Sequence, residues 1–455
     1  MNNYGVVGLV LPSAIHANEG ATGIRKLFLN QMSLKYCYSY ENKKKLFEID
    51  SRFKFALIVA EKKFGGTKEF SCAFYLHDEE WLFDERRIDL KYSLFFVEKT
   101  GGVHLSFLEC RDAKSLSIFN KCLDVGRFTL KSYLDNKKII LRQGFSLNRE
   151  NSLIHYTQEK KWETFNVSLK NSIVYVYEGK NFYLYTDRFS ERPQYSTDIN
   201  NFYKKAHWPE SIVHYRLAFR KVAASTNERT MVSAILPYGI VFVDSVCAET
   251  IPNARATYYA LCICSIFNSF TFDYLVRQKV SANVMFYLIE NLPYPEIDGI
   301  KKIFLSHTAL QLISNHDGFA FIWYEQLGDN WREPNKKPFT WSVLSTDEER
   351  WEVRSAIDAV VADAYGLNRE QYEHVLHSFD RASGSNPYTD ICLAKFDELK
   401  QIGLDVFTKK YDPYWDIPLN ENLPQPVIHL PIPQEEEEKD LFGEIVASKK
   451  LRKRK

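Results

Sequence analysis

The feature that most constrains the fold of this chain is the segment Tyr258–Gln278, which is almost wholly apolar. Its length and composition predict one long helix that is buried on nearly all sides. A polar loop, Arg277-Gln-Lys-Val-Ser-Ala-Asn, follows at its end. A buried helix that ends in a basic, amide-rich loop can hold that loop on a rigid base for binding. The same pattern is typical of a core helix with an ordinary polar end, so both interpretations stay open.

Two apolar segments precede this helix. Tyr215–Arg220 is a short apolar and aromatic run that contains arginines, and Thr230–Pro237 is an apolar strand that a Pro-Tyr-Gly turn ends. Positive charge is concentrated here, because residues 201–229 hold six basic residues and two acidic ones, a local charge of +4. The whole chain has a formal net charge of only +1, so any surface for a polyanion must come from such a cluster. The basic residues of the cluster are Lys204, Lys205, Arg216, Arg220, Lys221 and Arg229.

The composition describes a globular chain with a large core. Its 455 residues are enough for two to four domains, and 45% hydrophobic with 15% aromatic residues indicates much β-structure. The eight cysteines show no CxxC and no metal-site spacing with histidine, so we expect core thiols. The apolar segment Tyr258–Phe272 is too short, and too interrupted by Asn268 and Ser269, to span a bilayer. We therefore expect a cytoplasmic protein without a membrane span or a metal site.

Residues 1–62 have the pattern of an α/β unit. Val6–Leu11 is a continuous apolar run, which predicts a strand buried on both faces of a sheet. A short amphipathic helix is predicted at Thr22–Asn30, and Leu34–Tyr40 is expected to pair with Phe53–Ala60 in a hairpin. The residues expected to face inward are Ile24, Leu27 and Phe28 on the helix and Phe53, Phe55, Leu57 and Val59 on the second hairpin strand.

Residues 63–200 are predicted to be rich in strands. Ser172–Asp187 alternates aromatic residues across two expected strands that would join at Glu178-Gly-Lys. Tyrosines beside lysines in this hairpin suit contact with phosphates and bases, and they equally suit an ordinary sheet face. The other strands predicted here are Phe70–Leu76, Tyr92–Glu98, Val103–Leu108 and Lys137–Arg142.

From about residue 300 the pattern becomes helical. Lys302–Ser314 and Thr346–Ala364 have apolar residues at helical spacing, and Thr346-Asp-Glu-Glu is a predicted N-terminal cap of the second helix. Residues 412–433 are rich in proline and predict an extended strap, and a charged tail follows them. No internal repeat is present in the sequence.

Several long motifs, in a fixed order, resemble one enzyme family. The chain contains FRKVAASTNERT, then AILP, then FNSFTFDYLVRQKVS and LPYP. In this order they resemble the target-recognition half of adenine-N6-specific DNA methyltransferases. More narrowly, they are similar to Type IIG restriction–modification and phage-defence enzymes, in which recognition domain and methyltransferase share one polypeptide. Three further segments are similar to this family: GLVLPSAIHANEGATGIRKLFL, YSYENKKKLFEIDSRFKFALIVAEK and DEERWEVRSAIDAVVADAYGLNREQYEHVLHSF.

The resemblance implies a fold class and a division into four parts. Residues 1–62 would be an α/β remnant of a Rossmann-like methyltransferase domain, in which an antiparallel strand joins a mostly parallel sheet. Residues 63–300 would be a β-rich (α+β) target-recognition domain, with the YEGK element inside Ser172–Asp187. Residues 301–411 would be a helical C-terminal region, and residues 412–455 the strap and charged tail.

The earlier motifs of the family are missing from the sequence. Neither the glycine loop that holds S-adenosylmethionine nor the Asn/Asp-Pro-Pro-Tyr/Phe tetrapeptide occurs in it. The resemblance therefore implies no catalytic residue and no cofactor in this chain, although the complete enzyme would use S-adenosylmethionine. We expect a chain that begins inside the catalytic domain, with a separate chain carrying the N-terminal methyltransferase part and perhaps a nuclease. Two alternatives are a truncated inactive relic and a protein-binding scaffold of a defence complex.

The resemblance also implies double-stranded DNA as partner, with candidate contacts. Phe47 is at the position where the family places an aromatic residue between the last two sheet strands, where it could stack on an adenine turned out of the duplex. Alternatively, Phe47 only fills the hairpin. The basic cluster named above would contact phosphates or bases, and arginine and amide side chains can read bases in the major groove. The residues expected to read bases in the loop are Arg277, Gln278, Lys279, Ser281 and Asn283.

Overall fold

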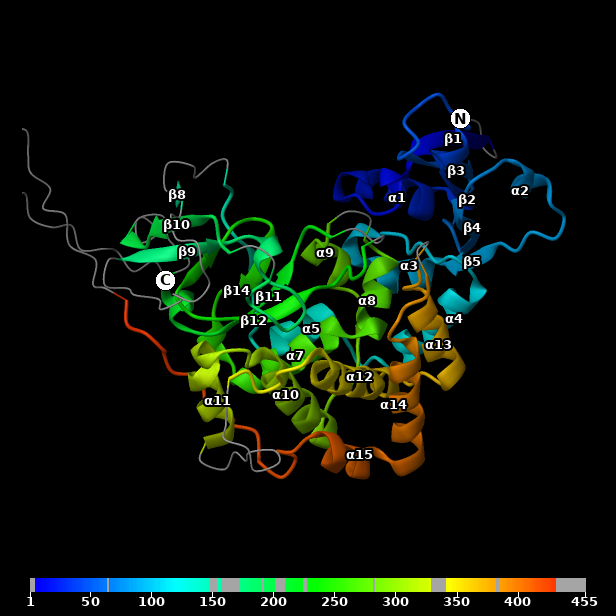
Figure 1. The fold of residues 1–455 in the computed structure, drawn as a ribbon. Helices are drawn as coiled ribbons and strands as arrows, with labels where there is room; N and C mark the ends of the chain where they lie inside the picture. The colour runs from blue at the N-terminus through cyan, green and yellow to red at the C-terminus, as the bar shows by residue number, and fades with distance from the viewer. Residues whose placement is uncertain are drawn as a thin grey trace, which may run out of the picture.

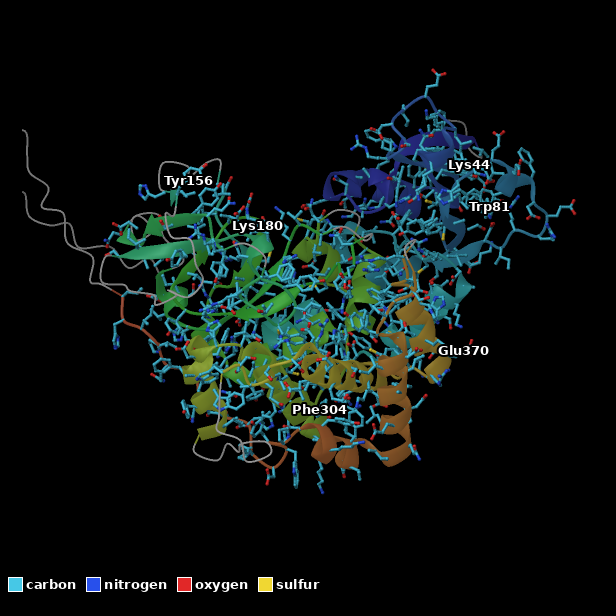
Figure 2. The ribbon with its side chains drawn as sticks, in the orientation of Figure 1. Lys44, Trp81, Tyr156, Lys180, Phe304 and Glu370 are labelled. Atoms are coloured by element: carbon cyan, nitrogen blue, oxygen red, sulfur yellow. The ribbon has the colours of Figure 1, made fainter. Side chains whose placement is uncertain are left out.

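The structure is a computed structural model of the chain. Two groups of strands lie on opposite sides of the molecule, with helices α8 (Phe270–Arg277) and α9 (Phe286–Ile289) between them and a layer of helices below (Figure 1). Lys44 and Trp81 lie around the first group, Tyr156 and Lys180 around the second, and Phe304 in the helical layer (Figure 2). The residues that the structure describes are 5–63, 65–147, 154–156, 172–189, 192–200, 209–223, 227–280, 283–328, 341–381 and 384–430.

The first sheet has five strands in the order β1-β3-β2-β4-β5. β3 is antiparallel to both β1 and β2, so those two outer strands run parallel to each other. The hairpin predicted from the sequence is therefore confirmed, and β2 also pairs in parallel with β4. The sheet contains strands from both sides of residue 62, the expected end of the methyltransferase part. The division into four parts stays a prediction. The strands are β1 (Val6–Pro12), β2 (Ser33–Glu41), β3 (Lys54–Glu61), β4 (Glu69–Leu76) and β5 (Leu90–Ser93).

β1 is an exposed edge strand, so the prediction of a strand buried on both faces was wrong. Within the described residues β1 pairs only with β3. Val6 is 66% exposed, Val10 is 55% exposed and Leu9 is 38% exposed. A continuous apolar run favours burial on both faces of a sheet. In β1, no element of the described chain covers either face fully.

The short helix after β1 buries a different face from the one predicted. α1 (Thr22–Lys26) continues into a π-helical turn at Leu27–Gln31, which shifts the phase of the side chains. Leu27, expected inside, is 41% exposed, while Phe28 is buried as expected. Arg25 is fully buried instead, and it donates hydrogen bonds to the carbonyl oxygens of Ile15, Asn18 and His104 at 2.8–2.9 Å.

The inward face of β3 also differs from the prediction. Ala56, Ile58 and Ala60 pack into the main core, whereas the set that starts at Phe53 points to the opposite face of the sheet. On that outer face Phe55 is buried in a small cluster with Tyr38 and Tyr40. The large aromatic side chains of β3 suggested the wrong face. The face that packs into the main core carries the small residues Ala56 and Ala60, which leave room for the helices on that side.

The predicted strands of residues 63–147 are confirmed only in part. β4 matches Phe70–Leu76, but the expected strand at Tyr92–Glu98 is strand only as far as Ser93. There Ser93 caps α3 (Leu94–Gly101) by accepting a hydrogen bond from the backbone N–H of Phe96. Val103–Leu108 is no strand. β7 (Leu141–Gln143) begins near the end of the last predicted strand, and two further helices, α4 (Ala113–Val125) and α5 (Leu130–Asn136), were not predicted.

The second group of strands forms two four-stranded sheets, ordered β13-β9-β10-β8 and β12-β11-β14-β7. The hairpin predicted at Ser172–Asp187 was wrong: only its first half is a strand, and a capped 3-10 turn at Gly179–Asn181 follows it. β9 pairs in parallel with β13, which is distant in sequence. The strands are β8 (His155–Tyr156), β9 (Ile173–Tyr177), β10 (Tyr195–Asp198), β11 (Arg216–Arg220), β12 (Ser233–Leu236), β13 (Ile240–Phe242) and β14 (Val246–Glu249).

The long apolar helix is in fact two helices, α7 (Thr257–Asn268) and α8, which meet at an angle of 65°. The side chain of Asn268 bonds the backbone of Ser233 in β12, and the Ser269 hydroxyl caps α8 by accepting from Phe272 N–H at 3.1 Å. Both helices are buried, as predicted. Among the described residues no single helix is long and apolar enough to cross a membrane, although this bent pair together passes by length and composition.

The C-terminal part is helical, as predicted. α10 matches the first predicted helix, and α12 begins with the expected cap, in which Thr346 and Glu349 each bond the other's backbone N–H. Residues 412–430, the described part of the strap, contain no helix or strand, and the charged tail lies outside the described residues. The helices are α10 (Gly299–Ile313), α11 (Ala320–Leu327), α12 (Asp347–Ala364), α13 (Arg369–His377), α14 (Thr389–Ile402) and α15 (Leu404–Tyr411).

Candidate nucleic-acid interface

A pocket of about 370 Å³, called pocket A here, lies between the first sheet and the loop after α8. It opens where β1 ends and β3 begins, next to the carboxyl ends of the parallel strands β1 and β2. Ligands of α/β sheets usually bind at such an edge. The polar residues that line pocket A are Ser13, Asn18, Lys54, Tyr75 and Glu109 on the sheet side and Arg277, Gln278, Lys279 and Asn283 on the loop side.

A chain of ion pairs supports the sheet side of pocket A. The fully buried His16 places its Nδ1 3.0 Å from Glu109, and Lys54 lies 3.5 Å from Glu109 and 3.4 Å from Glu41. Burial disfavours the charged form of His16, but the neighbouring Cys37 and Glu109 outweigh it and raise its pKa to about 9. Burial likewise opposes the charge of Glu109, but the bonds from His16 and Lys54 lower its pKa to about 2. Glu109 is therefore a fixed, paired anion in the pocket wall.

Tyr75 has a cation on its ring at two positions. The Lys54 amine lies 4.4 Å from the ring centroid, and the Arg111 guanidinium lies 4.3 Å from it. The backbone of Tyr75 has a φ of +61°, at a register shift between β2 and β4. This unusual conformation turns the ring out of the strand and into the pocket wall. The arrangement offers two cations beside an aromatic surface.

A second pocket, called pocket B here, has a volume of about 210 Å³ and adjoins pocket A. Tyr75, Arg277 and Gln278 line both pockets, so together they form one continuous surface. The other polar residues that line pocket B are Arg111, Asp112, Ser115, Tyr274, His374, His377 and Ser378.

Gln278 has an unsatisfied acceptor at the junction of the two pockets. The residue is only 8% exposed, and its Oε1 atom has no hydrogen-bond partner among the described residues. Its backbone carbonyl is held in place by the Glu109 N–H at 3.0 Å. A buried acceptor without a donor costs about 1–3 kcal/mol, which a ligand with an N–H or O–H group would recover. Gln278 is thus a loop residue with an acceptor that the described part of the chain leaves without a donor.

Two other loop residues are committed to contacts inside the protein. Lys279 is buried and donates to the Thr100 carbonyl and the Ser106 hydroxyl. Burial, followed by the nearby charge of Arg25, lowers its pKa to about 7. The prediction that Lys279 contacts DNA does not fit this position, because its amine bonds the protein and carries only part of its charge at neutral pH.

Arg277 likewise holds the structure together. It donates to the carbonyl oxygens of Asn227 and Glu228 at 2.6 and 2.7 Å, and its guanidinium lies 3.9 Å from the ring centroid of Phe379. It still lines both pockets. Asn283 is exposed in the wall of pocket A, and Ser281 lies outside the described residues.

Two members of the basic cluster of residues 201–229, Arg216 and Arg229, lie inside the protein and not on its surface. Arg216 is fully buried, with its guanidinium 4.2 Å from the Phe242 ring and a hydrogen bond to the Ile240 carbonyl. Arg229 is buried against Asp273 at 2.8 Å. Both guanidinium groups bond residues inside the protein, and the phosphate and base contacts predicted for them stay predictions. A count of charges along the sequence does not show that a carboxylate and aromatic rings enclose these two arginines.

The remaining members of the cluster are partly accessible or not described. Arg220 is half-buried, donates to the Phe182 carbonyl, and lies beside the rings of Tyr183 and Phe189. Lys221 is partly exposed. Lys204 and Lys205 lie outside the described residues.

Phe47 lies in the loop between β2 and β3 with 44% of its side chain exposed. Its ring meets Phe55 edge-on at 4.8 Å, and Asn42 bonds both its backbone N–H and its carbonyl at about 3 Å. One part of the ring therefore fills the hairpin while the rest is accessible. Phe47 does not line pocket A or B, and its stacking on a base stays a prediction.

The cysteine prediction is confirmed, because all eight thiols are buried and free. Among the described residues no group of three or more His, Cys, Asp or Glu could hold a metal ion. Sequence reasoning missed Lys54, Tyr75, Glu109 and Arg111. Lys54 lies inside the segment YSYENKKKLFEIDSRFKFALIVAEK but nothing in that segment marks it as a site residue, and the other three stand in no quoted motif. The fold brings the four together from three separate segments.

Comparisons of the whole chain with known proteins found similarity to solved structures. No protein-family model matches the chain, and no curated protein matches it. The Type IIL restriction–modification enzyme MmeI in complex with DNA aligns with a TM-score of 0.40 and 9% identity over 87% of this chain and 50% of that one. The type IIG restriction endonuclease BpuSI aligns with a TM-score of 0.32 and 11% identity over 82% of this chain and 48% of that one. The Type ISP restriction–modification enzyme LlaBIII bound to DNA aligns with a TM-score of 0.36 and 9% identity over 70% of this chain and 25% of that one. The chain thus spans about half the length of the first two structures.

Proposed function

We propose that this chain recognises a specific sequence in double-stranded DNA as part of an adenine-N6 DNA methyltransferase or restriction–modification system. The observation that carries the proposal is the buried Oε1 of Gln278, which has no hydrogen-bond partner among the described residues, at the junction of pockets A and B. Next to it, the Lys54 amine and the Arg111 guanidinium both lie within cation–π distance of the Tyr75 ring. Cations for phosphates beside an amide for a base edge are what a sequence-reading surface requires.

The first sheet supports a methyltransferase origin. The strand β3 lies antiparallel between β1 and β2, which are parallel to each other. The resemblance implies an antiparallel strand added to a mostly parallel sheet. The position of β3 fits this, although three of the four strand pairings in the described sheet are antiparallel. Phe47 lies in the β2–β3 connection, where the resemblance expects an aromatic residue.

The open edge and outer face of this sheet support a partner that supplies the catalytic part. Val10, Leu57 and Tyr38 lie in one row across the sheet, as their pairing register shows. Val10 is exposed and Leu57 only partly buried, so an apolar row ends at an unpaired edge. An exposed apolar edge strand invites another strand to pair. We assign that strand to a chain with the cofactor loop and the Asn/Asp-Pro-Pro-aromatic motif.

S-adenosylmethionine does not fit the residues of pocket A. The one carboxylate among the described residues that line the pocket, Glu109, already bonds His16 and Lys54, so pocket A offers the cofactor's amino and hydroxyl groups no carboxylate without a partner in the protein. We assign cofactor binding to the partner.

A protein-binding scaffold is the second candidate function, and the same apolar row favours it. In that case the chain would bind a partner protein through the first sheet and would not bind DNA. The two candidates differ in one measurable property, the affinity of pockets A and B for duplex DNA.

The test compares DNA binding of the wild type with that of the double variant Lys54→Ala/Arg111→Ala at several salt concentrations. Each lost phosphate contact should lower the log–log salt slope by about 0.9, so the double variant should lose about 1.8. The control is Lys400→Ala/Lys410→Ala on α14 and α15, whose lysines pair with Asp363 and Glu398. An equal slope for wild type and double variant would exclude the pockets from the interface, and no DNA binding at all would favour the scaffold.

A further inference from the structure

A third pocket, of about 200 Å³, is lined by three arginines and is called the arginine pocket here. It lies where α12, the start of α8 and the segment before α14 meet. Arg229, Arg354 and Arg381 contribute the positive charge, and Glu228 is the one acidic residue that lines the pocket. Such an excess of guanidinium groups in a small space is unfavourable unless anions balance them.

Arg354 is held by aromatic rings and not by an acceptor. Its guanidinium lies 3.7 Å from the ring centroid of Trp351, and Trp351 stacks on Tyr388 with centroids 3.3 Å apart. Within the described part of the chain, the Arg354 guanidinium makes no hydrogen bond and no ion pair. A guanidinium carries five N–H donors, and a partly buried one without acceptors is costly.

The carboxylates around Arg354 are engaged elsewhere. Asp273 accepts from Arg229 at 2.8 Å, and Glu228 lies 3.2 Å from Arg381. Asp358, one helical turn after Arg354, accepts from the backbone N–H of Phe270 at 2.6 Å. Burial, followed by the like charge of Arg229, lowers the pKa of Arg354. Among the described residues that line the pocket, the one carboxylate, Glu228, therefore pairs with Arg381 and leaves Arg354 without a paired anion.

We propose that the arginine pocket is a binding site for a phosphate group, with Arg354 as its central ligand. The planar fork of Arg354, kept in place by Trp351 and Tyr388, can donate two parallel hydrogen bonds to a phosphate. Arg381 at the exposed rim adds a second cation, while Arg229 lines the pocket and already pairs with Asp273. Trp351 is covered by Tyr388 and Arg354, so the pocket recognises the phosphate and not an attached base.

The phosphate has two possible sources, the backbone of a nucleic acid or a free phosphate ester. The proposal rests on the geometry of this pocket alone and holds whether or not pockets A and B bind DNA. The arginine pocket shares no lining residue with pocket A or B. The experiment therefore begins with inorganic phosphate.

The thermal midpoint of the full chain is measured in potassium phosphate and in potassium chloride at equal ionic strength. A ligand that binds only the folded state raises the midpoint, so phosphate should stabilise the wild type more than chloride does. Arg354→Gln should need at least tenfold more phosphate for the same shift, whereas Arg354→Lys should retain part of it. The matched control is Arg86→Gln, whose side chain is 92% exposed and pairs only with Asp84 within the described residues.

Arg381→Gln keeps the test informative if Arg354→Gln does not fold. Arg381 is half-exposed, so its loss should cost little stability and still weaken the phosphate effect severalfold. A salt slope for duplex DNA that falls by about 0.9 in Arg354→Gln would identify the nucleic-acid backbone as the source. An unchanged slope with a lost phosphate effect would identify a free ester. An equal phosphate effect in wild type and Arg354→Gln, or none in the wild type, would overturn the proposal.

Discussion

The buried imidazole of His16 bonds the Glu109 carboxylate at 3.0 Å, across 93 positions of sequence. Through this contact the turn after β1 is tied to the segment that leads into α4. His16 also lies 3.7 Å from the Cys37 sulfur of β2, and Glu109 in turn bonds Lys54 of β3. One histidine thus connects three strands with the wall of pocket A.

The first prediction concerns the pH dependence of stability. His16 has its pKa raised from 6.5 to about 9, so the stability it contributes is complete below pH 6.5 and is lost as the pH rises toward 9. Glu109 has its pKa lowered from 4.5 to about 2, so its contribution is complete above pH 4.5 and is lost in acid. His16→Gln should cost about 1.5–3 kcal/mol at pH 6 and should flatten the decline between pH 6.5 and 9. Urea unfolding across this range measures it.

The control for this prediction is His377→Gln, because that histidine is half-exposed and its partner Asp380 is three residues away. The control should keep the wild-type profile. A His16→Gln profile that falls as steeply as the wild type above pH 6.5 would contradict the assignment.

The second prediction concerns Arg229, which sequence reasoning placed at the DNA surface. Arg229→Ala removes the nearer partner of a buried ion pair and leaves Asp273 with Arg277 at 3.7 Å, so it should destabilise the fold by about 3–5 kcal/mol. Arg86→Ala, on an exposed loop, should change the free energy of unfolding by less than about 0.5 kcal/mol. Denaturant unfolding of both variants checks this. Full stability of Arg229→Ala together with a lower DNA salt slope would restore the original interpretation.

The third prediction concerns base readout by Gln278. Gln278→Ala removes an acceptor that has no partner among the described residues and also loses the packing of a buried side chain, so these opposite effects should leave the unfolding free energy nearly unchanged. On the preferred DNA site it should cost about 1–3 kcal/mol and relax discrimination at one position. Selection from a randomised duplex library, followed by binding to single-substitution sites, measures both effects. Asn283→Ala, exposed in the same pocket wall, is the comparison, and uniform weakening across all sequences would make either residue a backbone contact.

The fourth prediction concerns assembly at β1. The chain alone should transfer no methyl group, and it should do so with a partner that carries the cofactor loop and the Asn/Asp-Pro-Pro-aromatic motif. Val10→Lys places a charge in the exposed apolar row and should block assembly, whereas Val103→Lys, exposed outside the strands, should not. Co-purification and transfer from labelled S-adenosylmethionine to duplex DNA are the measurements. Methyl transfer by the isolated chain would refute the proposal that a partner supplies the catalytic part.

The reconstituted pair also tests Phe47. If the exposed part of its ring stacks on an extruded adenine, Phe47→Ala should reduce transfer to a normally paired adenine most, and less to a mismatched one, which leaves the stack more easily. Equal reduction on both substrates would leave Phe47 as a residue that only fills the hairpin against Phe55.

Local signals in the sequence were sufficient for several elements. The Thr346 cap, the helix that it starts and the β2–β3 hairpin all follow from residues within a few positions of one another. Capping bonds and alternation depend on neighbours in the chain, so the sequence alone determines them. It also determined that the α7–α8 segment is buried, because its composition allows no exposed face.

The tertiary structure decided everything that depends on distant partners. The bend between α7 and α8 occurs where Asn268 bonds Ser233, and Arg229 is buried because Asp273 accepts its charge. The apolar run of β1 is exposed because no described element covers it. Whether a charge reaches solvent, or an apolar face is covered, is set by atoms far away in sequence. The residues of pockets A and B meet for the same reason, since neither composition nor spacing along the chain encodes which segments fold together.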